Sequence, residues 1–170
     1  MENRYSLWII PFLEVKQILQ QTISDLSVKY QTPNFEPHMT LIGDVPGDEK
    51  TIIEKAEILV SKIKPFPLTL GEISFSTTYF QSVFVRVKST AELMNANLKA
   101  KEIYHVDNNV FMPHISLIYG DHSMEEAEKI ASALTIPNNL SFKAEKIVVI
   151  PSTQNPDDWQ HLVELPFKAN

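Results

Sequence analysis

The sequence contains no cysteine and only two arginines, Arg4 and Arg86. The absence of cysteine excludes disulfides, thiol nucleophiles and thiolate metal ligands, and it suits a reducing compartment, so we expect a cytoplasmic protein. No apolar run approaches the roughly 20 residues that cross a bilayer. The N-terminal apolar run is too short for a signal peptide and ends at Pro11. We therefore expect no association with a membrane.

Positive charge is also scarce, because 15 Lys and Arg face 21 Asp and Glu and give a formal net charge of −6. Proteins that bind long nucleic acids normally present a basic face. The charge balance therefore favours a small substrate, and we expect no stable nucleic-acid complex. A chain of 170 residues can bury a sizeable core. We expect a single bilobal domain over residues 1–170 that acts as a monomer.

One short phrase occurs twice: residues 35–42 read FEPHMTLI and residues 111–118 read FMPHISLI. Each copy places a histidine two residues before a small hydroxyl residue, His38 before Thr40 and His114 before Ser116, and 76 positions separate the copies. A packing accident would repeat the apolar pattern, but not the imidazole and the hydroxyl as well. The repeat predicts a duplicated unit whose halves each supply one histidine and one hydroxyl to a shared site.

Strands and helices alternate in two comparable halves, and each histidine lies on a predicted strand that a helix follows. Apolar spacing and capping residues, among them Asp48 and Ser123, predict helices over 14–28, 48–63, 91–103 and 123–134, with Leu98 facing inward in the third. β-prone runs predict strands over 5–10, 35–42, 68–76, 79–88, 110–119, 140–150 and 159–165.

The repeated residues suit the chemistry of a phosphodiester. Side chains alternate along a strand, so His38 and Thr40 are expected to point the same way, about 7 Å apart, and His114 and Ser116 likewise. Two imidazoles can serve as general base and general acid, while two hydroxyls donate hydrogen bonds to an anion. Since charging one imidazole disfavours charging the other, we expect a bell-shaped rate profile with its optimum near neutral pH. No metal or cofactor is required.

Other interpretations of these residues stay open at this stage. A lone strand histidine is usually structural, and a histidine pair can also bind metal, although zinc sites usually have three or four protein ligands. Tyr119 and Trp159 can stack on a base or simply pack. Gln81 can bond a substrate or sit as a polar residue on a strand face.

Several polar residues are expected outside the reaction. His105, His122 and His161 lack a repeated partner and are expected to be exposed, and Asp44 is expected in a turn or at a helix cap.

The twin His-x-Thr-Leu and His-x-Ser-Leu motifs resemble the signature of the two-histidine phosphoesterase superfamily. Within it, the chain resembles the cyclic phosphodiesterases of plants and yeasts. The matching stretches run nearly end to end, and they are residues 5–11, 35–41, 79–84, 112–119 and Trp159. The resemblance implies an α+β fold of two pseudo-symmetric α/β lobes, each with an antiparallel sheet and flanking helices, around a central cleft.

The resemblance also implies an activity. That family opens ADP-ribose 1″,2″-cyclic phosphate to ADP-ribose 1″-phosphate, and nucleoside 2′,3′-cyclic phosphates to 2′-phosphates. It implies that His38, Thr40, His114 and Ser116 are catalytic and that Tyr119 and Trp159 bind substrate. Plant members carry cysteines that can form disulfides, so their redox control cannot be carried over to this cysteine-free chain. The rival functions are an RNA-end 2′,3′-cyclic phosphodiesterase and a non-catalytic binder of cyclic nucleotides.

Overall fold

The structure is a computed structural model that describes residues 3–107 and 110–169. Its strands are β1 (Arg4–Ile9), β2 (Met39–Pro46), β3 (Phe66–Phe75), β4 (Val83–Val87), β5 (His114–Ile118), β6 (Ser141–Ala144), β7 (Lys146–Pro151) and β8 (Val163–Pro166). Its α-helices are α1 (Leu13–Tyr30), α2 (Glu49–Ser61), α3 (Ala91–Tyr104) and α4 (Met124–Ala133), and its short 3₁₀ helices are η1 (Tyr79–Gln81) and η2 (Pro156–Asp158). No helix in these ranges is long and apolar enough to cross a membrane.

The eight strands form one curled sheet in the order β6-β3-β4-β5-β2-β1-β7-β8, and every neighbouring pair is antiparallel. The sheet falls into two four-stranded halves that meet where β5 lies beside β2. This seam is short, with Met39 opposite Ile115 as its registered pair. The expected α+β fold with two pseudo-symmetric halves is confirmed, and the two half-sheets join along one edge.

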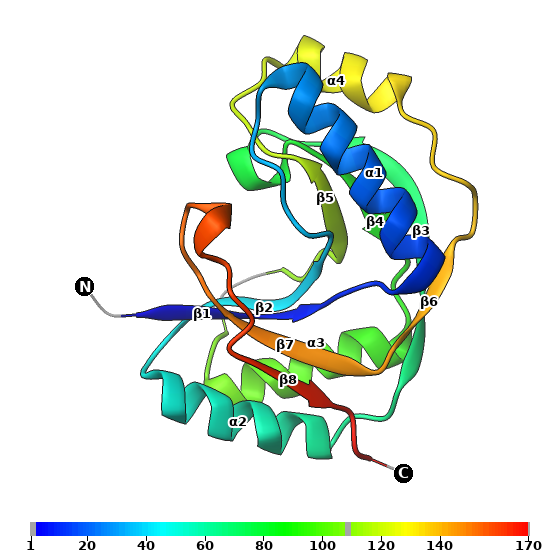
Figure 1. Ribbon diagram of the computed structural model, residues 1–170. Helices are drawn as coiled ribbons and strands as arrows, with labels where there is room; N and C mark the ends of the chain where they lie inside the picture. The colour runs from blue at the N-terminus through cyan, green and yellow to red at the C-terminus, as the bar shows by residue number, and fades with distance from the viewer. Residues whose placement is uncertain (1–2, 108–109, 170) are drawn as a thin grey trace.

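Helices cover each half on one side (Figure 1). α1 and α4 lie together over the β3–β5 half, and α2 and α3 lie together under the other half. Two of the helices cross over. α1 follows β1 but packs against β5, and α3 follows β4 but packs against β2. Each half of the sheet is therefore covered in part by a helix that follows a strand of the other half. These packing contacts hold the two repeat strands, β2 and β5, side by side.

Local signals explain where the helices begin and end. The side chains of Asp48, Thr90 and Ser123 each accept a hydrogen bond from the backbone N–H three residues later, so the caps expected at Asp48 and Ser123 are confirmed. α1 and α3 both end at a residue with left-handed backbone, Gln31 and His105 respectively.

The repeat strands start later than expected. β2 begins at Met39 and β5 at His114, so His38 sits just before its strand. The repeat prolines Pro37 and Pro113 explain the delay, because proline has no N–H to donate to a ladder.

Other expected strand boundaries were also wrong. Residues 79–81 form a 3₁₀ helix rather than the start of a strand. Residues 140–150 are two strands, β6 and β7. Trp159 follows η2 instead of opening the last strand, which begins at Val163. Leu98 is 60% exposed, so it does not face inward.

A buried amide ties α3 to the first repeat strand. The Asn97 side chain is 4% exposed and donates from Nδ2 to the Leu41 carbonyl over 2.8 Å. Asn97→Ala should destabilise the protein by about 1–3 kcal/mol, because it leaves that buried carbonyl without its partner. Urea unfolding measures the effect. Asn95→Ala is the matched control on the exposed side of the same helix. An equal cost for both variants would contradict this role of Asn97.

Candidate active site

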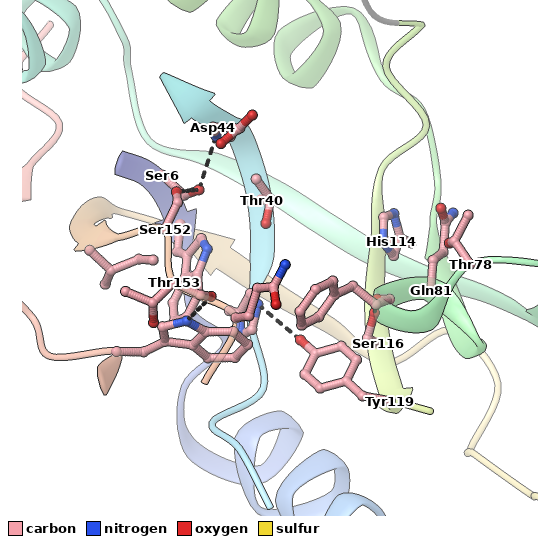
Figure 2. A pocket seen from close by; sticks show the side chains of 17 residues that line it. Ser6, Thr40, Asp44, Thr78, Gln81, His114, Ser116, Tyr119, Ser152 and Thr153 are labelled. Atoms are coloured by element: carbon pink, nitrogen blue, oxygen red, sulfur yellow. Dashed lines mark hydrogen bonds between the residues drawn. The ribbon is translucent and has the colours of Figure 1, made fainter. Parts of the chain in front are cut away.

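The sequence-predicted site residues meet in one cavity of about 570 Å³ between the two halves of the sheet (Figure 2). Elements far apart in the chain supply them: β2 and the segment before it, η1, β5, and the loop that follows β7. All seven expected residues line this cavity, and they are His38, Thr40, Gln81, His114, Ser116, Tyr119 and Trp159. The two His-x-hydroxyl pairs therefore converge as the repeat predicted.

Each histidine is oriented by the backbone just before it. Nδ1 of His38 lies 2.6 Å from the Glu36 carbonyl oxygen, and Nδ1 of His114 lies 2.8 Å from the Met112 carbonyl oxygen. A carbonyl only accepts, so Nδ1 carries the proton in both rings and Nε2 is left as the acceptor. The repeat proline contributes because it restricts the residue before it to an extended backbone.

His38 is enclosed by aromatic rings. Its imidazole stacks on Trp8 with ring centres 3.5 Å apart and planes 9° apart, and the residue is 8% exposed. Burial lowers the pKa of His38 to about 4, the Glu36 carbonyl and carboxylate oppose this, and a charged His114 would lower it further. The His38 imidazole is therefore uncharged at neutral pH.

His114 has a similar but not identical setting. Phe84 meets its ring edge-on, with centres 5.2 Å apart. Burial lowers the pKa of His114, the hydrogen bond to Met112 raises it, and the positive charge of Arg86 lowers it again. Both repeat histidines are thus biased towards the neutral form before substrate binds.

The two hydroxyls differ in what they contact. Ser116 Oγ donates to the Phe80 carbonyl over 2.8 Å, which ties β5 to η1. Among the described residues, Thr40 Oγ1 has no hydrogen-bond partner. Only the Thr40 hydroxyl is therefore free to donate to a ligand without first giving up a protein contact.

Tyr119 and Trp159 close the cavity around His38. Tyr119 is 2% exposed, and its hydroxyl makes a long contact of 3.5 Å with His38 Nε2. Burial raises the pKa of Tyr119 above its ordinary value, so the phenol keeps its proton. Trp159 meets His38 edge-on at 5.7 Å, and its indole N–H donates to the Thr153 carbonyl over 2.9 Å.

Two more aromatic contacts lie at the cavity. Phe80 and Trp159 both line it, with ring centres 6.4 Å apart and planes inclined by 47°. Gln81 lines the cavity beside them, and its amide nitrogen lies 3.9 Å from the Met112 sulfur.

Sequence reasoning missed a polar corner at the far end of the cavity. The hydroxyls of Ser6 and Ser152 are 2.6 Å apart, and Ser6 also accepts from the Asp44 N–H over 3.3 Å. Asp44 was expected in a turn or at a helix cap, but it lies within β2 with φ +58° and pairs with Arg4 at 2.8 Å. One signal was available, because Ser6 and Trp8 recur as Ser82 and Phe84 at the same 76-residue spacing.

The charge on the cavity wall is low. Among the described residues that line it, none is lysine or arginine, and Asp44 carries the only fixed charge. The histidines are neutral before substrate binds, so the free cavity presents hydrogen-bond donors and aromatic faces rather than positive charge.

The three histidines outside the repeat were expected to be exposed, and two of them are. His105 and His161 are exposed as expected. His122 is not, since its side chain is 9% exposed and packs edge-on against Tyr30. His161 also has a role that sequence reasoning missed. Its Nε2 lies 2.7 Å from the Glu36 carboxylate and its Nδ1 lies 3.0 Å from Glu164, so it links β8 to the segment that carries His38.

Comparison with known proteins identifies the family of this chain. The family model described as "Cyclic phosphodiesterase-like protein" matches residues 3–165. The chain belongs to the cyclic phosphodiesterase-like family. Membership makes it a phosphodiesterase enzyme of the two-histidine phosphoesterase superfamily.

Two relatives match most of the length of this chain. A cyclic phosphodiesterase of Arabidopsis thaliana is 28% identical over 153 residues, which cover 85% of this chain and 83% of the relative. A 2′,3′-cyclic-nucleotide 3′-phosphodiesterase of Yarrowia lipolytica is 24% identical, and the match covers 92% of this chain and 96% of the relative. The solved structure of E. coli LigT with 3′-AMP shares the fold, with a TM-score of 0.65, 16% identity and coverage of 98% and 99%.

Because the pKa of His38 is low in the folded protein, we expect the free energy of unfolding to depend on pH. The unfolded histidine has a pKa near 6.5, so as the pH falls from 6.5 towards 4 the unfolded chain takes up a proton that the folded His38 refuses. The free energy of unfolding should therefore drop by about 2–3 kcal/mol across this window from His38 alone. Urea unfolding at pH 7.5 and pH 4.5 measures the drop.

Two variants isolate this contribution of His38. His38→Gln should show a drop smaller by that amount, because glutamine does not titrate. His105→Gln, which changes an exposed histidine, should behave as the unaltered protein does. An unaltered drop in His38→Gln would show that His38 does not carry the effect.

Proposed function

We propose that this phosphodiesterase hydrolyses small nucleotide cyclic phosphates without a metal, using His38 and His114 as its acid–base pair. The candidate substrates are ADP-ribose 1″,2″-cyclic phosphate and nucleoside 2′,3′-cyclic phosphates. One observation carries the proposal: two neutral imidazoles, each with Nδ1 on a backbone carbonyl, line one cavity together with the two repeated hydroxyls. The similarity to the plant and yeast enzymes supports the choice of substrate class.

The reaction uses the Nε2 atoms, which are left as acceptors in both imidazoles. One imidazole takes a proton from water through Nε2 as the water oxygen forms a bond to phosphorus. The bond from phosphorus to one ring oxygen breaks, and the other histidine, protonated in the complex, gives its proton to that oxygen. The product is a phosphate monoester with one free hydroxyl. Thr40 donates to a non-bridging oxygen, which stabilises the charge that builds up there.

Burial of the two histidines has a kinetic consequence. An anionic phosphate beside the imidazoles favours a protonated histidine, so substrate itself raises the pKa that burial has lowered. The free protein holds both histidines neutral near pH 7, and the complex charges one of them. The aromatic residues Tyr119 and Trp159 exclude water from His38 and strengthen this coupling.

Replacing either histidine should nearly abolish turnover. His38→Ala and His114→Ala should each lower kcat by about 10²–10⁴-fold, the typical contribution of a positioned acid or base. Hydrolysis of ADP-ribose 1″,2″-cyclic phosphate and of the four nucleoside 2′,3′-cyclic phosphates, followed by phosphorus NMR, measures rate and product together. Activity should survive exhaustive chelation. A near-normal rate in either variant, or binding without turnover in the unaltered protein, would overturn the proposal.

The same assay should show a bell-shaped dependence of kcat/KM on pH. Both histidines have a lowered pKa in the free protein, so the maximum should lie on the acid side of 6.5 rather than near neutrality. The maximum of kcat should lie at higher pH, because bound phosphate favours the imidazolium. A kcat/KM that stays flat to high pH would show that no protonated histidine is needed.

The unequal contacts of the hydroxyls predict unequal variants. Thr40→Ala removes a free donor and should lower kcat by roughly 10²-fold, while Thr40→Ser should restore most of the rate. Ser116→Ala also breaks the bond to the Phe80 carbonyl and should raise KM, because it loosens the η1 rim. The two alanine variants are compared by kcat and KM separately. Equal harm from Thr40→Ser and Thr40→Ala would mean that the hydroxyl is not the working group.

A further inference from the structure

A second cavity, of about 360 Å³, lies next to the candidate active site. We call it the Arg86 pocket, and its lining residues are Gly71, Glu72, Arg86, Val87, Lys88, Ser89, Met112 and Pro113. It combines two cations with the backbone that leads into His114. We propose that the Arg86 pocket is an anion subsite that holds the pyrophosphate of a dinucleotide-like substrate while its cyclic phosphate lies between the histidines. This inference rests on the proposed function and specifies its substrate.

The position of Arg86 places the pocket beside the reaction. Arg86 pairs directly with His114 across the β4–β5 ladder, and directly opposed residues project from the same face of a sheet with Cβ atoms about 5 Å apart. The Val87 N–H also donates to the Pro113 carbonyl over 2.9 Å, which fixes the pocket wall to the residue before His114.

A thin wall separates the two cavities. Gln81 lines the active-site cavity, Met112 lines the Arg86 pocket, and their side chains touch at 3.9 Å. A substrate that occupies the first cavity therefore needs to extend past a single pair of side chains to reach the second. The pyrophosphate of ADP-ribose 1″,2″-cyclic phosphate lies one ribose away from its cyclic phosphate, which suits this arrangement.

The charges argue for the same orientation. The described lining of the active-site cavity has no lysine or arginine, and its far end carries the Asp44 carboxylate. Arg4 lies next to that carboxylate but is already paired with it, so a pyrophosphate would find no unpaired lysine or arginine in the described lining there. The Arg86 pocket instead offers a guanidinium and an ammonium, which bind phosphate oxygens well.

Arg86 retains capacity for a ligand. Its Nε is buried without a hydrogen bond, and the Glu72 carboxylate lies 3.6 Å from it, beyond hydrogen-bonding distance. The Glu72 side chain is 79% exposed, so it can move aside at little cost. Lys88 meets Asn139 at 2.9 Å on the exposed surface, a contact that a phosphate can replace.

The test compares two substrates that differ in the second anion. ADP-ribose 1″,2″-cyclic phosphate carries a pyrophosphate and adenosine 2′,3′-cyclic phosphate does not. Arg86→Gln and Lys88→Gln should lower kcat/KM for the first substrate about 10- to 100-fold more than for the second. Lys143→Gln makes the same charge change at an exposed position of β6 and should leave the ratio unaltered. Equal losses on both substrates would overturn the subsite, because Arg86 would then act through His114 alone.

Binding separates failure of the subsite from failure of the proposed function. ADP-ribose, which has the pyrophosphate but no cyclic phosphate, should bind the unaltered protein and bind both variants at least tenfold more weakly in calorimetry. This result would support the subsite even if the protein hydrolysed neither substrate. Unchanged ADP-ribose affinity in both variants would overturn it. A selective loss seen only with an oligoribonucleotide that ends in a cyclic phosphate would also overturn it, in favour of an RNA strand.

Discussion

The hydrogen bond from each repeat histidine to the carbonyl two residues before it is the contact on which the site depends. It spans 2.6 Å at His38 and 2.8 Å at His114, and it leaves both Nε2 atoms as acceptors. The same short phrase supplies the carbonyl, the proline that keeps the backbone extended, the imidazole and the hydroxyl. Local sequence therefore sets the tautomer, and the fold only has to bring two copies together.

Bringing the copies together is the task of the exchanged helices and the aromatic residues. α1 and α3 each pack on the repeat strand of the opposite half, so the seam at Met39 and Ile115 does not rest on its own short ladder. Trp8 then covers His38 on one face, and Tyr119 and Trp159 border it elsewhere. The burial of His38 by these rings lowers its pKa and keeps its imidazole uncharged, so the same contacts that pack the ring also set its protonation state.

The four polar residues of the site and their convergence could be predicted, because each histidine and its hydroxyl residue lie two positions apart in a phrase that occurs twice. Trp159 was expected to open a strand, but it lies in an irregular loop where the indole N–H bonds the Thr153 carbonyl, a contact with no periodic signal. The exchange of α1 and α3 could not be predicted either, because an apolar stripe does not identify which sheet it covers. The bond from Ser116 to the Phe80 carbonyl likewise depends on tertiary placement.

The duplication makes two similar half-sites, but hydrolysis needs two different ones. The two halves differ at positions beside the histidines that are not the same in the two copies of the repeat. Position 36 is glutamate, tied to His161 and Lys16, and position 112 is methionine, touched by Gln81. Position 10 is isoleucine, and its equivalent 76 residues later is Arg86, beside His114. Burial lowers the pKa of both imidazoles, but the Glu36 carboxylate raises that of His38 while the Arg86 guanidinium lowers that of His114 further. The two neighbours therefore act on the histidines in opposite directions. In the reaction proposed above, the repeated positions keep the same functional groups, and their differing neighbours are what would distinguish the histidine that acts as acid from the one that acts as base.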